Sequence, residues 1–238
     1  MLKRIRLGDV AIHVIRKDIK NVHLSVYPPM GRVRISAPTG LSMDTIRLFA
    51  ISKLGWIKRQ QKKFREQERE TRRELLDRES HFVWGRRYLL KVVEADAAPR
   101  IELSHNRMIL YVRPGSGSNK KGEIVERWYR EQVRLAVPAL LAKWEPVIGI
   151  RVERFFVQRM KTKWGRCNNR ARRIRLNTDL AKKPIECLEY VVVHELVHIL
   201  EPTHSERFHG ILERALPNWR IYKDELNRLP IRHEEWDL

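Results

Sequence analysis

The sequence is poor in cysteine and lacks any long apolar run. Its 238 residues include two cysteines, Cys167 and Cys187, which excludes the disulfide framework of a small secreted domain. No apolar stretch approaches the ~20 residues of a membrane-spanning helix. The start, Met1-Leu2-Lys3-Arg4-Ile5-Arg6, lacks the apolar core of a signal peptide. We therefore expect a cytoplasmic protein with no membrane partner.

Acidic residues are scarce relative to basic ones. Lysine and arginine number 49 against 29 for aspartate and glutamate, so the formal net charge is +20. Such an excess favours anionic partners, nucleic acid or another polyanion, although net charge alone describes attraction and identifies no site. Hydrophobic residues make up 42% of the chain, which is enough for the core of one large domain or two smaller ones.

The first half of the chain alternates strand-like runs with turn signals. The pattern predicts strands at 10–15, 22–27 and 33–36, the last two joined as a hairpin through 28–31. A helix is expected from Ser42 or Asp44, followed over 58–79 by a charged stretch typical of a solvated helix. Strands return at 88–93, 100–103 and 108–112.

Residues 114–119 are the best linker candidate, because proline, glycine and serine are concentrated there. We therefore predict a β-rich region with a long charged helix over 1–118, and a second domain over 119–238. The second domain should contain a helix over 123–144 with a candidate kink at Pro138, and strands at 154–158 and 174–177. Helices should follow from Ile185 and over 205–215. This order predicts an α+β fold.

The segment His194-Glu195-Leu196-Val197-His198 is the strongest chemical signal in the chain. On a helix, His194 and His198 lie one turn apart on the same face, so both imidazoles can bind one metal ion. Glu195 is placed to act as a base without itself binding the metal. Imidazole nitrogens suit Zn²⁺, and a catalytic zinc site needs three protein ligands with one open position.

His204 is our choice for the third ligand. Pro202 cannot continue the helix, so the chain should leave it near Glu201 and turn back toward the metal. The spacing equals that of metzincins, but Glu201 stands where those enzymes carry glycine, and no methionine follows the motif. The pattern therefore indicates a zincin that is not a metzincin, with its motif helix packed on a sheet.

Four segments resemble the YgjP-like metallopeptidase-domain family. They are Ser36-Ala37-Pro38 with Gly55-Trp56-Ile57, Trp84-Gly85-Arg86-Arg87-Tyr88, Lys163-Trp164-Gly165-Arg166-Cys167 with Leu176-Asn177, and the metal motif with His204 and Phe208. The resemblance implies a zincin related to SprT-like and WLM proteases, with ligands His194, His198 and His204 and base Glu195. Arg166 and His209 depart from the family pattern, which commonly has serine and tryptophan there.

Several residues near the motif have open roles. Developing negative charge in peptide hydrolysis needs a donor, and the candidates are Lys161, Lys163, Arg166 and Tyr222. His209 is either a partner of a ligand or a packing residue. Glu206 and Glu213 fit zinc less well than His204, and Cys167 is more simply a buried thiol.

Three functions follow from these features. The first is a zinc metallopeptidase that cleaves protein or peptide substrates with Glu195 as general base, acting near nucleic acid. The second is a nucleotide or phosphoester hydrolase of the nucleoside triphosphate pyrophosphatase type, which no glycine-rich phosphate loop supports. The third is a non-catalytic zinc module for DNA restriction or repair, which would not need the base Glu195.

Overall fold

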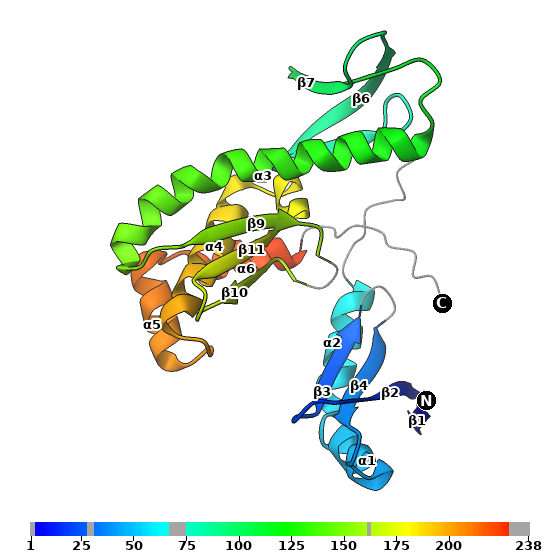
Figure 1. Ribbon diagram of the computed structural model, residues 1–238, viewed down its shortest axis with the longest axis vertical. Helices are drawn as coiled ribbons and strands as arrows, with labels where there is room; N and C mark the ends of the chain where they lie inside the picture. Colours follow the sequence, from blue (N-terminus) through cyan, green and yellow to red (C-terminus); the bar gives the residue numbers. More distant parts are fainter. Residues whose placement is uncertain (1–2, 28–30, 67–74, 161–162, 229–238) are drawn as a thin grey trace. The chain divides into compact units, whose positions relative to one another are not determined.

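The computed structural model describes residues 3–27, 31–66, 75–160 and 163–228 (Figure 1). Its elements fall into two compact units, one within residues 1–70 and one within 71–229. The sequence analysis instead placed the division after residue 118. The difference arises because the strands between residues 80 and 112 share a hydrophobic core with the helices that follow them. The predicted α+β class is confirmed.

The first unit is a mixed four-stranded sheet covered by two helices. Strands β1 (Lys3–Leu7), β2 (Val10–Lys17), β3 (His23–Tyr27) and β4 (Arg32–Pro38) pair in the order β1-β2-β4-β3. The β3–β4 pair is antiparallel, as the predicted hairpin requires, although residues 28–30 lie outside the described residues. Alternating side chains of β2 and β4 are buried and pack against α1 (Met43–Ser52) and α2 (Leu54–Glu66).

The start of α1 follows from its sequence. The hydroxyl of Ser42 accepts a hydrogen bond from the backbone N–H of Thr45 at 3.1 Å, which satisfies one of the unpaired donors of the first turn. Ile46 and Ala50 then lie on the buried side of the helix. The predicted helical start at this point is therefore explained by its cap and its apolar face.

The charged helix is shorter than the sequence suggested. Helix α2 ends at Glu66, and residues 67–74 lie outside the described residues. Residues 75–79 are not helical. The side chain of Leu75 is buried in the core of the second unit, and its backbone N–H donates a hydrogen bond to the carboxylate of Glu79. The prediction of helix up to residue 79 is wrong there.

The second unit opens with another mixed sheet. Strands β5 (Ser80–Val83), β6 (Arg86–Glu94), β7 (Arg100–Ser104) and β8 (Arg107–Val112) pair in the order β5-β6-β8-β7. Buried residues of β6 and β8 belong to the same core as the long helix α3 (Ser118–Ile148), which continues through Pro138 and Pro146 and ends at Gly149 in the left-handed region. The sequence analysis missed β5.

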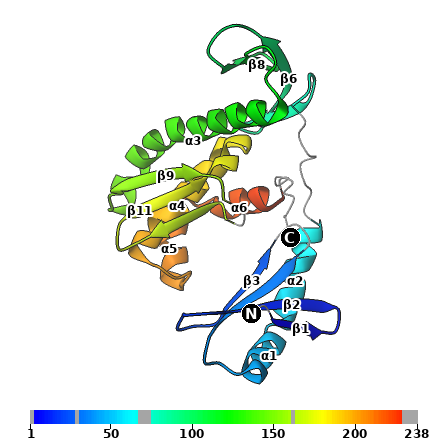
Figure 2. The same cartoon turned by 45° about the vertical axis from the view of Figure 1, so that its right-hand side comes forward.

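A three-stranded sheet, a short 3₁₀ helix and three α-helices complete the second unit. Strands β9 (Arg154–Gln158), β10 (Gly165–Asn168) and β11 (Arg173–Asn177) pair in the order β10-β11-β9, so that β10 is an edge strand. A short 3₁₀ helix, η1 (Thr178–Lys182), leads into α4 (Ile185–Leu200), which lies against β10 and β11 (Figures 1 and 2). Helices α5 (Glu206–Ala215) and α6 (Trp219–Arg228) both contact α4.

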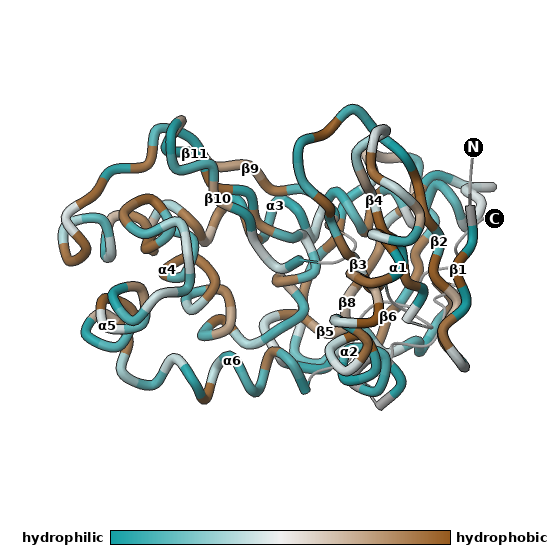
Figure 3. The backbone as a smooth tube through the Cα atoms, turned by 90° about the horizontal axis from the view of Figure 1, so that it is seen from below, coloured by the Kyte–Doolittle hydropathy of each residue, from teal (hydrophilic) through white to brown (hydrophobic). Residues whose placement is uncertain are grey.

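Helix α6 was missed because its sequence is mostly polar. Figure 3 shows it as largely hydrophilic, with short hydrophobic segments, and only Trp219 and Leu226 of this helix are buried. Helix α4 is the opposite case, since nine of its 16 residues are buried. Among the described residues, no helix has the length and apolar character needed to cross a membrane.

Candidate metal centre

Helix α4 places two imidazoles on one face, as the spacing of His194 and His198 predicts. The helix ends at Leu200, and the N–H of Glu201 donates to the carbonyl of Val197 at 2.9 Å. The chain then turns through Pro202 to His204, and Ser205 caps the next helix by accepting a hydrogen bond from the N–H of Phe208. The end of α4 at Leu200 and the N-cap of α5 at Ser205 therefore hold His204 beside the two histidines of α4.

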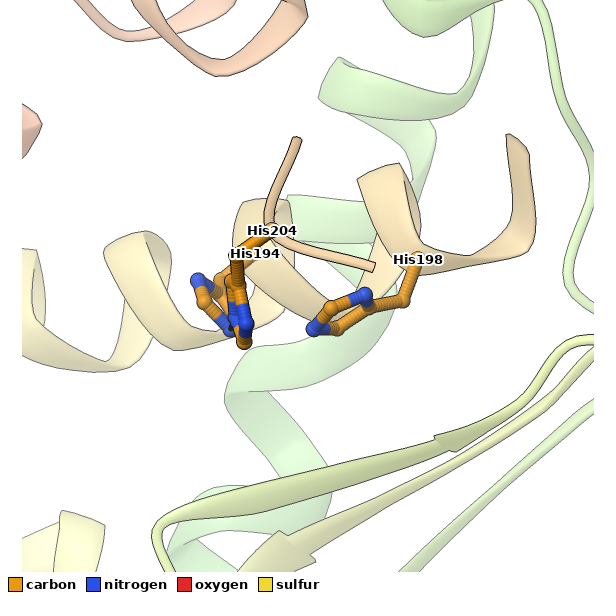
Figure 4. A group of neighbouring side chains, drawn as sticks. All are labelled: His194, His198 and His204. Atoms are coloured by element: carbon orange, nitrogen blue, oxygen red, sulfur yellow. Dashed lines mark hydrogen bonds between the residues drawn. The ribbon is translucent and has the colours of Figure 1, made fainter. Parts of the chain in front are cut away.

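The three histidines converge on one point. One ring nitrogen from each of His194, His198 and His204 lies within 4.8 Å of the others, and they form the only group of three or more potential metal ligands among the described residues. Figure 4 shows the ring of His198 pointing toward the neighbouring rings of His194 and His204. The Nε2 atoms of His194 and His204 are 3.2 Å apart. Two nitrogens bound tetrahedrally to one Zn²⁺ at about 2.0–2.1 Å lie roughly 3.3 Å apart.

The surroundings of the three imidazole rings are suitable for binding a metal cation. His198 directs its Nδ1 at the carbonyl oxygen of Glu201, 3.1 Å away, which leaves its Nε2 free for a metal. Burial lowers the pKa of His194, and the nearby rings of His198 and His204 add to this shift, which brings it to about 3. Burial also lowers the pKa of His204. Neutral imidazoles with unshared electron pairs are the form that binds a metal.

Phe208 forms an apolar support under the site. This side chain is fully buried, and its ring centroid lies 5.0 Å from that of His194, 4.7 Å from His198 and 4.8 Å from His204. Because one rigid ring touches all three imidazoles, it restricts their rotation. The sequence analysis quoted Phe208 only as part of a family pattern.

Glu195 lies in the same cavity as the histidines. This cavity of about 500 Å³ is lined by residues of α4, by the segment from Lys163 to Cys167 with Asn169, and by Pro202, His204 and Leu226. Only 4% of Glu195 is exposed, and its Oε2 makes no hydrogen bond with a described residue. Burial raises the pKa of the Glu195 carboxyl to about 8, and the charge of Lys163 opposes that shift. A buried carboxyl without a partner is costly in a purely structural role.

The four predicted charge-stabilising residues are placed differently. Lys163 and Arg166 line the cavity. Tyr222 is on α6, where its backbone carbonyl accepts a weak hydrogen bond from Cys187, and it is not among the residues that line the cavity. Lys161 lies outside the described residues.

The other residues with open roles do not join the histidine group. His209 stacks on Trp219 with ring centroids 5.6 Å apart and on His204 with ring centroids 6.4 Å apart, so it lies beside one histidine of the group without belonging to it. Glu213 accepts hydrogen bonds from Trp219 and Arg220, and Glu206 is exposed at the start of α5. Cys167 lines the cavity, but burial and the charge of Glu195 raise its pKa to about 11, so it stays a thiol.

Two residues that shape the cavity were missed as functional residues. Gly165 of β10 packs directly against the Glu195 carboxylate. Asn177, which is 4% exposed, holds the segment that precedes β10: its amide donates to the carbonyls of Met160 at 2.8 Å and Lys163 at 2.9 Å. No strand was predicted at residue 165, so the glycine lacked the strand context in which it often marks a close approach.

Comparison with known proteins agrees with this geometry. The family model for the YgjP-like metallopeptidase domain matches residues 20–229. The chain belongs to the YgjP-like family. The resemblance seen in the sequence is thereby confirmed. This YgjP-like chain is a metallopeptidase domain, and membership of this family implies a divalent metal ion.

Other comparisons add little to the assignment of this YgjP-like domain. No curated protein sequence matches the chain. Among solved structures, the chain is similar to the metallopeptidase zymogen abylysin of Pyrococcus abyssi, with 22% identity and a TM-score of 0.36. That match covers 38% of this chain and 90% of the other.

Proposed function

We propose that the protein is a zinc-dependent peptidase in which Glu195 is the general base. The observation that supports this most directly is the convergence of three imidazoles beside a buried carboxyl in one open cavity. His194, His198 and His204 would hold the metal. Three neutral nitrogen ligands and one remaining position are the arrangement of catalytic zinc sites.

The metal and the protein side chains have separate tasks. When bound, Zn²⁺ supplies Lewis-acid chemistry, which makes water more acidic and the scissile carbonyl more electrophilic. Glu195 accepts the proton of the attacking water and passes it to the departing amine nitrogen. Burial raises the pKa of this carboxyl in the metal-free protein, and a bound cation would oppose that shift and so favour the carboxylate that acts as the base.

The edge strand β10 supports a peptide as the substrate. Gly165, Arg166 and Cys167 of this strand line the cavity, and one edge of β10 has no partner strand in the described sheet. An extended peptide can add a strand to such an edge and so bring its carbonyls past the metal ligands. Lys163 and Arg166 provide positive charge for the oxyanion that forms as the carbonyl is attacked.

The test is to replace Glu195 by glutamine and measure both cleavage and metal content. We expect Glu195→Gln to slow hydrolysis of a denatured casein substrate at least ~100-fold, the lower end of the usual effect of a general base. Zinc content should stay at one ion per chain, because Glu195 is not a ligand. Glu206→Gln is the matched control, since Glu206 is an exposed glutamate outside the cavity. Cleavage that persists in Glu195→Gln would refute the proposed base.

A further inference from the structure

The sheet β10-β11-β9 has one buried side and one arginine-rich side. In β11, Ile174 and Leu176 are fully buried against the core, whereas Arg173 and Arg175 between them are exposed. The exposed Arg166 of β10 and Arg154 of β9 pair with them across the strands. Neither the three strands nor the turn over 169–172 contains an aspartate or a glutamate, and that turn adds the exposed Arg170 and Arg172.

The register of the sheet brings like charges together. Arg166 lies directly opposite Arg175, and Arg173 lies directly opposite Arg154. Like charges in such cross-strand pairs destabilise a sheet. Among the described residues, no carboxylate forms an ion pair with any of these four arginines. A ligand that carries negative charge would offset the repulsion between these arginines.

An aromatic ring lies among these arginines. Phe156 is opposite Arg175 on β9, and the guanidinium carbon of Arg175 is 5.6 Å from the centre of the ring. Its neighbours Phe155 and Val157 pack against the core, but Phe156 does not. Phosphate-binding arginines beside a ring that can stack on a base form the usual surface for single-stranded nucleic acid.

We propose that this surface, the arginine face of Arg154, Phe156, Arg166, Arg173 and Arg175, binds single-stranded nucleic acid. The arginines contact phosphates, and Phe156 stacks on a base. Because Arg166 also lines the catalytic cavity, a bound strand passes the mouth of that cavity. A protein carried on the strand is then held beside the metal centre, a consequence that rests on the proposed peptidase function.

The test measures binding without turnover. A fluorescein-labelled 20-nucleotide oligo-dT is titrated with the zinc-loaded protein, and anisotropy is recorded at several salt concentrations. We expect Arg154→Gln/Arg173→Gln/Arg175→Gln to weaken binding at least tenfold at 0.1 M salt. The slope of log K against log salt should become shallower by about 2, because each lost phosphate contact contributes ~0.7 for a single strand. Phe156→Ala should weaken binding of the single strand severalfold while leaving the salt slope unchanged, because stacking releases no counterions.

The control separates the arginine face from overall charge. Arg127→Gln/Arg130→Gln/Arg134→Gln removes the same charge from exposed positions of α3 in the same unit. Circular dichroism and zinc content establish that each variant is folded. Equal losses in the two triple variants would overturn the proposal, as would no binding by the parent protein. Tighter binding of a 20-base-pair duplex or of polyglutamate would overturn the choice of ligand. None of these results depends on whether peptides are cleaved, so failure here is distinguishable from failure of the peptidase proposal.

Discussion

Gly165 and Glu195 share a space that has no room for another carbon atom. A Cβ at position 165 would lie 2.5 Å from Oε1 of Glu195 and 2.8 Å from its Cγ. Strand β10 therefore approaches α4 closely enough to fix the position of the carboxylate only because residue 165 has no side chain.

We predict that Gly165→Ala impairs catalysis without loss of metal. The added methyl group must displace the Glu195 carboxylate, and a displacement of about 1 Å in an active site can cost ~100-fold in rate. The value of kcat should fall on that scale, while zinc content stays at one ion per chain. Gly210→Ala is the control, since a Cβ on this α5 glycine meets no atom within 4 Å. Wild-type kcat in Gly165→Ala would show that this contact does not position the base.

The convergence of the three histidines was predictable from the sequence because its geometry is mostly local. His194, Glu195 and His198 are placed by helical spacing alone, and Pro202 ends the helix before His204. Gly165, Asn177 and Tyr222 depend instead on how β10, β11 and α6 pack around α4, which no local pattern specifies. The same reason explains the domain division, since the shared core of β6, β8 and α3 is formed by residues far apart in the sequence.

A second prediction concerns Asn177, which ties the segment before β10 to the end of β11. Asn177→Ala removes the two hydrogen bonds that the side-chain amide donates to the carbonyls of Met160 and Lys163, and the two that its Oδ1 accepts from the N–H groups of Met160 and Asp179. Leaving buried polar groups without partners costs about 1–3 kcal/mol in the free energy of unfolding. We also expect KM to rise more than kcat falls, because Lys163 and the edge of β10 shift while the histidines stay in place. Asn106→Ala, in an exposed turn, should change neither quantity. The checks are urea unfolding and steady-state kinetics, and an unchanged KM would contradict the role assigned to this residue.

A third prediction compares two neighbouring histidines, one inside and one outside the group of potential metal ligands. His204 belongs to the convergent group, whereas His209 stacks on Trp219. His204→Ala should leave less than one zinc ion per chain after dialysis against a weak chelator, and peptide cleavage should be lost with the metal. His209→Gln should retain the metal. Metal analysis of both purified variants decides this, and full zinc occupancy in His204→Ala would remove it from the ligand set.

The last prediction concerns pH and the metal-free protein. The pKa of Glu195 is about 8 in the folded protein against an ordinary value of 4.5. Between pH 7 and 8 the unfolded chain has already lost this proton while the folded protein still holds part of it. The free energy of unfolding should therefore fall as pH rises, by on the order of 1 kcal/mol per pH unit. His194 acts weakly and in the opposite direction in this window, because its pKa is lowered to about 3 from an ordinary value of 6.5, and most of the stability that it contributes is lost at lower pH.

The measurement is urea unfolding of chelator-treated protein at pH 7.0, 7.5 and 8.0. Glu195→Gln should remove the fall in stability over this range, because glutamine has no proton to lose. Bound zinc should remove it as well, since a nearby cation lowers the pKa of the Glu195 carboxyl toward its ordinary range. Zinc should therefore bind with release of a proton from Glu195 at pH 7, and the release should be smaller by that one proton in Glu195→Gln. A stability of the metal-free wild-type protein that does not change from pH 7 to 8 would mean that Glu195 is already ionised without the metal.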